Sequence, residues 1–427
     1  MNNIKFRYPN LTAGYIGIKI GNATLNSDYF ANLFTDGYTP DKYIIFPQRV
    51  LREDFFSEVV ALEGKYFLES FKIFRSKLSQ NLKEILLEFS KGKSSSRALI
   101  NIMNIALRYG LFKEIEEINI NEINNRLDTS DLIEIILQIE IAKFRLNNND
   151  NPNLQLTNLE NMAEMVLSGT ALTERVQIVI LTFLIVMTYR YGAKLNYEKY
   201  AQPMYNRIIY ILDNLNDNTF GSKIRESVAY RGIAMVREIS KELKIEYLAR
   251  AQRIARGIKP GNTLEEIIFK ENLYTCLQTF SKWNMHLNQF DLAEKNLIEM
   301  TLIDPNDSTA FGELGFLLFN QERIAEAADA FKQAAKLGPP AVGMHTYFYA
   351  KCLQEMGQDN EAMKTLYKAA ELDKNAVSPW LDIVELYTSM NKQDKAKSVA
   401  QSILANSDYM EQLEEDEISM LITLLKI

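Results

Sequence analysis

The stretch that decides the fold is DPNDSTAFGELGFLLFNQERIAEAADAFKQAAKLGPP, residues 304–340. It contains two runs in which apolar residues recur at three- and four-residue intervals, with the polar turn NQER between them and two prolines at the end. This spacing is typical of amphipathic helices, and proline ends a helix because it lacks a backbone N–H and clashes with the preceding turn. The stretch therefore predicts a helical hairpin.

The hairpin pattern recurs at a nearly fixed period. Alanines near the start of the second helix of each pair are 34, 35 and 34 residues apart, and they are Ala293, Ala327, Ala362 and Ala396. Before each alanine a large residue stands beside a mostly small one, as in Leu314-Gly315. Two helices approach closely where a small side chain faces a bulky one. A single hairpin cannot bury its apolar face alone, so the hairpins are expected to stack.

This period and these residue types resemble the tetratricopeptide repeat (TPR), whose unit is about 34 residues long. Four such units cover about 274–407. The resemblance implies an all-α fold, an α-solenoid of stacked helical hairpins with a TPR-like superhelix, which binds a partner in its concave groove. Residues 261–407 are predicted to hold the four units, and the acidic and then apolar segment 408–427 is predicted to be a helix that caps the stack.

The sequence before the repeats has two parts that differ in composition and in hydrophobic periodicity. Residues 1–50 are dense in glycine and proline, which predicts a short irregular or β-containing segment with candidate strands at Tyr15–Ile20 and Lys42–Phe46. Residues 51–260 have helical periodicity but no fixed repeat length, so we expect a domain of degenerate helical hairpins. Pro260-Gly261 marks the predicted boundary to the repeats.

One face of the first helix in each unit is expected, from the TPR resemblance, to line the groove. The predicted partner-binding residues are Lys282, Met285, Phe316, Phe319, Tyr347, Lys351, Gln354, Leu381 and Glu385. This row is partly apolar with two lysines and one glutamate, which suits an extended or helical peptide with apolar anchors. The alternative is that Phe316, Phe319, Tyr347 and Leu381 are buried against neighbouring helices.

A second candidate surface is basic. Arg250, Arg253 and Arg256 recur at every third residue, followed by Lys259, and this spacing places the arginines on one helix face. They form a candidate patch for a phosphate or an acidic partner. The alternative is a solvated face, or contacts with neighbouring acidic helices.

Composition argues against several other classes of protein. The net charge of −7 disfavours nucleic acid and anionic membranes as partners. The longest apolar run, Val176–Met187, is too short to span a bilayer and is expected to be a core helix. The chain has two cysteines and two histidines, and His286 and His345 are expected in exposed or turn-stabilising roles. We therefore expect no metal, no cofactor and no catalytic residue, and a cytoplasmic protein.

The leading hypothesis is a non-enzymatic adaptor that binds a partner peptide or protein in the TPR groove, as a chaperone, an assembly factor or a subunit of a complex. One alternative is a TPR regulator that senses a peptide or an effector protein and acts through residues 1–260. Another is a carboxylate-dependent enzyme that uses the N-terminal region. The oligomeric state does not follow from the sequence.

Overall fold

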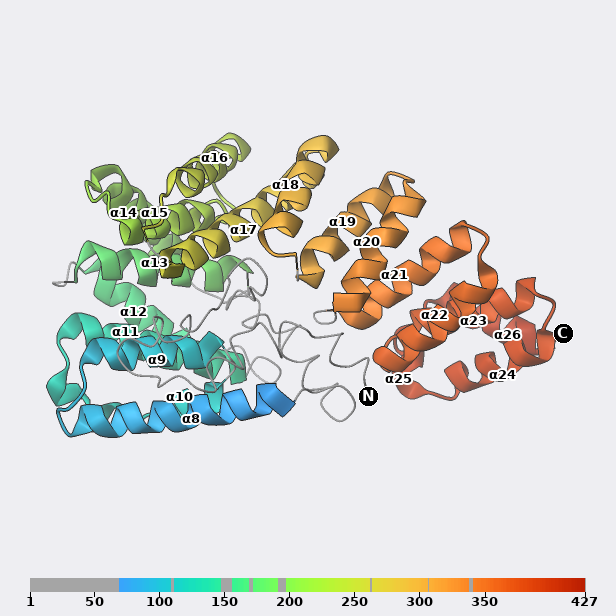
Figure 1. Cartoon of the computed structure of the whole chain (residues 1–427), viewed down its shortest axis with the longest axis horizontal. Helices are drawn as coiled ribbons and strands as arrows, with labels where there is room; N and C mark the ends of the chain where they lie inside the picture. The colour runs from blue at the N-terminus through green and yellow to red at the C-terminus, as the bar shows by residue number, and fades with distance from the viewer. Residues whose placement is uncertain are drawn as a thin grey trace. The chain divides into compact units, whose positions relative to one another are not determined.

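The computed structural model describes residues 69–108, 111–146, 156–168, 172–190, 197–261, 263–305, 307–337 and 341–426. In these ranges the chain is helical and has no β-strand (Figure 1), which confirms the all-α prediction. The two predicted strands, and the whole predicted segment 1–50, lie outside the described residues. The described residues form two compact units, with one containing 69–283 and the other 284–426.

The N-terminal unit consists of helices that pack against their neighbours in the chain. They are α8 (Glu69–Ser90), α9 (Ser96–Arg108), α10 (Phe112–Glu116), α11 (Thr129–Leu146), α12 (Leu156–Leu167), α13 (Glu174–Arg190), α14 (Gln202–Asn214), α15 (Phe220–Ile233), α16 (Lys241–Gly257) and most of α17 (Thr263–His286). The pairs α8–α9, α10–α11, α12–α13 and α15–α16 are in contact. This arrangement of adjacent pairs is the one expected for helical hairpins.

Helix α13 contains the longest apolar run of the sequence and lies in the core. Ile178, Leu181 and Leu184 are at most 2% exposed. Among the described residues, no helix combines the length and the apolar character needed to cross a membrane. The prediction of a core helix for this run is therefore confirmed.

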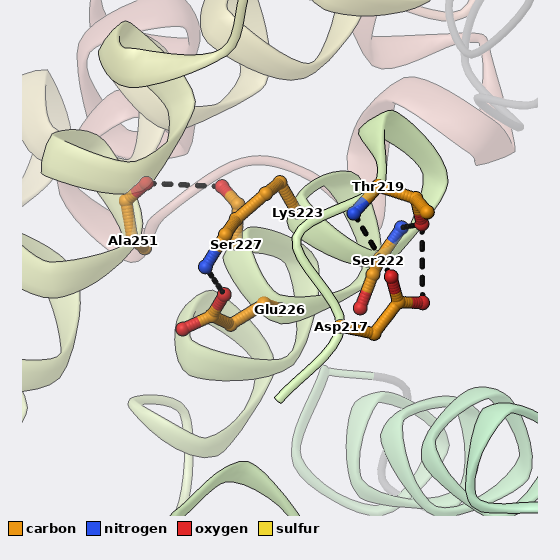
Figure 2. A network of polar contacts seen from close by, with 7 residues as sticks. All are labelled: Asp217, Thr219, Ser222, Lys223, Glu226, Ser227 and Ala251. Carbon is orange, nitrogen blue, oxygen red and sulfur yellow. Dashed lines mark hydrogen bonds and ion pairs between the residues drawn. The ribbon is translucent and has the colours of Figure 1, made fainter. Parts of the chain in front are cut away.

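Side-chain caps fix the start of α15, and one buried hydroxyl joins it to α16 (Figure 2). Thr219 accepts a hydrogen bond from the Ser222 backbone N–H at 3.4 Å, and Asp217 accepts from the Thr219 backbone N–H at 2.9 Å. These contacts satisfy amides that have no partner inside the helix. Ser227, on the buried side of α15, donates to the Ala251 carbonyl oxygen at 3.0 Å.

The C-terminal unit is a succession of helix pairs. Its helices are α18 (Phe290–Ile303), α19 (Ser308–Asn320), α20 (Ile324–Leu337), α21 (Val342–Glu355), α22 (Asp359–Leu372), α23 (Ser378–Ser389), α24 (Gln393–Leu404), α25 (Ser407–Met410) and α26 (Glu415–Lys426). Each of α19 to α23 contacts the next helix in the chain, so consecutive hairpins are stacked. The four alanines of the sequence repeat all have 0% exposure, because they lie where two helices touch.

The repeat is also present in the backbone. The turn inside each hairpin contains a residue with left-handed conformation, and these residues are Asn288, Glu322, Gly357 and Asn391, with φ values of 58°, 60°, 70° and 58°. Their spacing is the same as that of the buried alanines, because both mark the same point of each hairpin. Asparagine and glycine tolerate this conformation better than most residues, whereas glutamate is an uncommon choice.

The close approach of α19 and α20 requires a residue without a side chain at Gly315. A Cβ atom built there would lie 2.8 Å from Phe331, a residue of α20 with no exposed surface. In this hairpin, the small residue that precedes the repeated alanine is therefore a packing requirement.

The predicted domain boundary near residue 261 falls in the short connection between α16 and α17. The division between the two compact units falls elsewhere in the chain, between Trp283 and Asn284, within the residues of α17. The first predicted repeat thus begins in one unit and ends in the other. The fourfold division of the chain stays a prediction.

The last helix, α26, packs on α24. Leu421 has no exposed surface and joins Ala396, Ala400 and Ile403 in one apolar cluster. The acidic residues Glu415, Asp416 and Glu417 occupy the first turn of α26, where negative charge stabilises a helix. These contacts are the ones expected of a helix that closes the apolar end of a stack.

Candidate functional site

The predicted groove residues of α19 and α21 meet in an aromatic cluster. Phe316 makes edge-to-face contacts with Phe331 and Phe348, with ring centroids 5.0 and 4.6 Å apart. Phe319 contacts Phe348 at 6.2 Å, and Tyr347 contacts it at 5.2 Å. Edge-to-face contacts stabilise such clusters beyond the burial of area. The cluster therefore holds α19, α20 and α21 together.

The predicted aromatic residues are neither fully buried nor fully free. Phe316, Phe319 and Tyr347 are all half-buried, whereas Phe331 is inaccessible. Each of the three predicted side chains is therefore partly accessible, as expected for a groove residue, and partly packed against neighbouring helices, as expected for a core residue. Each of these rings is held in position by its contact with Phe348.

A charged pair continues this face from α21 to α23. The Lys351 Nζ atom lies 3.2 Å from both carboxylate oxygens of Asp382. Asp382 is only 8% exposed, so the lysine compensates a charge that has lost most of its water. Burial, together with the neighbouring Asp382 carboxylate, raises the pKa of the Tyr347 hydroxyl, which stays protonated at neutral pH.

Asp382 is not among the residues that the sequence predicted for this face. It lies 31 residues after Lys351, which is the 34-residue spacing between these two units less three residues, or about one helical turn. An acid at this separation from a lysine could have been recognised as its partner in the next hairpin. The neighbouring residues of the predicted row differ in exposure, since Leu381 is half-buried and Glu385 is exposed on α23.

The remaining residues of the predicted row are more scattered. Gln354 is half-buried, and its side-chain oxygen has no hydrogen-bond partner among the described residues. Met285 is half-buried and Lys282 is exposed, both near the end of α17. Lys282 belongs to the N-terminal unit, whereas the other predicted groove residues belong to the C-terminal unit. The residues that the structure brings together are those of α19, α21 and α23.

The basic residues of α16 do not all point to solvent. Arg250 is half-buried, with its guanidinium 4.9 Å from the centre of the Tyr230 ring, an arrangement that stabilises the α15–α16 pair. Arg253, Arg256 and Lys259 are exposed. Arg256 also has a partner within the protein. A patch for an anionic partner stays a prediction that rests chiefly on Arg253 and Lys259.

The expectation for one histidine is wrong. His286 is exposed at the end of α17, but His345 is only 3% exposed. It fits because Gly312 of α19 has no side chain, and a Cβ atom there would lie 2.2 Å from His345 Nε2. Burial lowers the pKa of His345 to about 4, although Asp307 opposes this shift, so the imidazole is neutral at physiological pH. Its Nδ1 atom has no hydrogen-bond partner in the described part of the chain.

Within the described ranges, no three histidine, cysteine, aspartate or glutamate side chains are grouped so that they could hold a metal ion. The Gly92-Lys93 segment that follows α8 is a turn, in which Gly92 has a φ of 75°. A side chain at Gly92 would collide with the Arg126 guanidinium. Left-handed backbone and close packing thus account for this glycine.

Comparison with known proteins agrees with the repeat. Residues 347–375, which span most of α21, the following turn and α22, match a family model described as Tetratricopeptide repeat. No curated protein sequence matches the chain. The family match identifies the hairpin of α21 and α22 as similar to a tetratricopeptide repeat, and the period, the buried alanines and the left-handed turns recur in the other hairpins of the C-terminal unit.

Several solved structures are similar to this chain, but they superpose loosely. A crystal structure of MamA is 17% identical with a TM-score of 0.31, covering 40% of this chain and 91% of MamA. YrrB, described as a TPR protein with an unusual peptide-binding site, is 14% identical with a TM-score of 0.34, covering 49% of this chain and 99% of YrrB. The APC/C hetero-tetramer Cut9-Hcn1 is 14% identical with a TM-score of 0.29, covering 87% of this chain and 75% of the matched chain.

Proposed function

We propose that the C-terminal unit is a protein-interaction module, which holds an extended or helical peptide segment of a partner protein on the face shared by α19, α21 and α23. The protein would act as a non-enzymatic adaptor. The observation that carries this proposal is the series of half-buried apolar side chains on successive hairpins. They are Phe316 and Phe319 on α19, Tyr347 on α21 and Leu381 on α23.

The aromatic contacts support this function because they fix the rings in advance. Phe316, Phe319 and Tyr347 are each in contact with Phe348, so binding would immobilise few additional side-chain torsions. Pre-organised side chains reduce the entropic cost of association. The exposed carboxylate of Glu385, on α23, would favour a partner segment that has a cation beside its apolar anchors.

The narrower roles are proposals of the same kind. An adaptor of this type could serve as a chaperone, as an assembly factor or as a permanent subunit of a complex, and we favour the adaptor because it requires only the exposed face. A cytoplasmic location is also proposed. Cys276 and Cys352 support it, since both are buried and unpaired, as is common in a reducing compartment.

The proposal is tested by selecting peptides from a displayed random library on the full chain, and then measuring the affinity of the selected peptides for variants. Phe319→Ser with Glu385→Lys alters the proposed face at half-buried and exposed positions. Lys364→Glu is the matched control, because Lys364 is an exposed residue of α22 whose side chain is 73% accessible.

We expect the selected peptides to lose about tenfold or more in affinity for the double variant, and to bind the Lys364→Glu variant like the wild type. Equal binding to the wild type and to the double variant, with circular dichroism showing both folded, would exclude this face as the binding surface.

A further inference from the structure

A cavity of about 170 Å³ lies in the N-terminal unit among helices α11, α13 and α15. Its lining residues are Glu134, Leu137, Arg175, Val176, Val179, Ile180 and Arg225. None of them belongs to the face proposed for partner binding or to the basic residues of α16. The cavity therefore calls for its own explanation.

The lining has an apolar base and a charged rim. Leu137, Val176 and Ile180 are 4%, 7% and 1% exposed, while Arg175 is exposed and Glu134 and Arg225 are half-buried. Two guanidinium groups and one carboxylate leave the lining with one positive charge, in a chain whose net charge is −7. An apolar cavity with a single uncompensated cation suits a ligand with an apolar tail and one negative charge.

The two arginines differ in the interactions that they already make within the protein. Arg225 lies close enough to Asp217 to contribute to the lowered pKa of that carboxyl group. Arg225 and Glu134 each have a further interaction within the protein. Arg175 lies in the first turn of α13 and has no hydrogen bond or ion pair with any residue that the structure describes. Arg175 is thus the cation available to a ligand.

We propose that this cavity binds a small monocarboxylate with a short apolar tail. The Arg175 guanidinium holds the carboxylate, because its fork of N–H donors matches two carboxylate oxygens. Leu137, Val176 and Ile180 surround the tail. At about 30 Å³ for each water-sized group, the cavity has room for about five or six such groups, which corresponds to a tail of about four to six carbon atoms. A doubly charged phosphate fits less well, since Glu134 would repel its second charge.

The experiment uses the full chain labelled at isoleucine, leucine and valine methyl groups. Hexanoate is titrated while the methyl resonances are recorded, and 1-hexanol serves as the uncharged control. We expect hexanoate to shift the resonances of Val176, Val179 and Ile180 with saturation, and hexanol to bind at least about tenfold more weakly, because it lacks the charge-assisted contact.

Three variants locate the site. Arg175→Gln is expected to lower hexanoate affinity about tenfold, and Val179→Trp to abolish binding by filling the cavity. Arg237→Gln is the matched control, because Arg237 is another exposed arginine of the same unit and lies outside both the cavity and the predicted basic patch. If the Val179→Trp variant fails to fold, Arg175→Gln alone decides the test, since its side chain is exposed.

A carboxylate with an apolar tail could be a free acid or the C-terminal leucine of a peptide. Titrations with acetyl-Gly-Leu and with 4-methylpentanoate, which has a similar branched tail but no peptide group, separate these sources. If acetyl-Gly-Leu binds more weakly than 4-methylpentanoate, the ligand is a free acid. If it binds more tightly, the ligand is a peptide end. Equal affinity for hexanoate and hexanol, an unchanged affinity of the Arg175→Gln variant, or no saturable shift with any acid would overturn the proposal. None of these outcomes bears on the peptide-binding face of the C-terminal unit.

Discussion

Replacing Gly312 by alanine should destabilise the C-terminal unit. The new Cβ atom would lie 2.2 Å from Nε2 of His345, and 2.8 and 2.9 Å from the two adjacent ring carbons. Alanine normally stabilises a helix by about 1 kcal/mol relative to glycine. Overpacking a closed site costs about 1–3 kcal/mol, and a contact this short belongs at the upper end of that range. We therefore expect a net loss of about 1–2 kcal/mol.

The imidazole has little freedom to avoid the new methyl group. His345 is 3% exposed, so its ring is enclosed on the sides away from Gly312 as well. Relief requires a shift of α19 relative to α21, which are in direct contact. The loss of stability should therefore appear in both helices, and not only at the substituted residue.

Hydrogen exchange measured by mass spectrometry is the suitable assay, because it reports the free energy of local opening for each helix of a repeat protein. In the Gly312→Ala variant, slowly exchanging amides of α19 and α21 should exchange about fivefold to thirtyfold faster, which corresponds to 1–2 kcal/mol. Gly257→Ala is the matched control. No atom lies within 4 Å of the Cβ position at Gly257, so this variant should be unchanged or more stable.

A second substitution identifies the cause. Replacing His345 by alanine removes the ring that the Cβ atom would strike, so the Gly312→Ala/His345→Ala variant should be less destabilised than the sum of the two single changes. If the Gly312→Ala variant exchanges like the wild type, or if the double variant shows the full sum, the imidazole does not occupy the space beside Gly312 and the reasoning is wrong.

Three further predictions concern the same unit. Lowering the pH from 6.5 to 4 should remove about 3 kcal/mol from the free energy of unfolding. The reason is that His345 binds a proton near its ordinary pKa of 6.5 in the unfolded chain, but only near pH 4 in the folded chain. The urea midpoint of a His345→Gln variant should therefore fall less steeply than that of the wild type between pH 6.5 and 4. Lys351→Met should destabilise the α21–α23 contact by about 1–3 kcal/mol, since it leaves the Asp382 carboxylate buried without its cation, and Lys351→Met with Asp382→Leu should recover most of the loss in urea unfolding. Leu421→Ala should cost about 2–4 kcal/mol through an internal cavity and should speed hydrogen exchange in α24, whereas Met420→Ala, at a position 48% exposed, should leave exchange unchanged.

The sequence by itself determined the helical fold and the repeat. The recurrence of buried alanines and small residues at 34 and 35 positions follows from local chemistry, because every helix pair must meet the same steric requirement where its helices touch. The Val176–Met187 run could likewise be assigned to a core helix from its length alone. These features depend only on the spacing of residues along the chain, and a single sequence is enough to show that spacing.

Which partner each side chain meets was decided only by the tertiary structure. His345 was predicted to be exposed or to stabilise a turn near a helix start, and its burial depends on the absence of a side chain at Gly312, one hairpin earlier. From the sequence, Phe316 was equally compatible with an open groove and with the core. In the structure it is half-buried, with one part of the ring packed against Phe331 and Phe348. The physical reason is that helical periodicity specifies the direction of a side chain from its own helix axis, whereas exposure depends on the neighbouring hairpins and on the angle at which they pack.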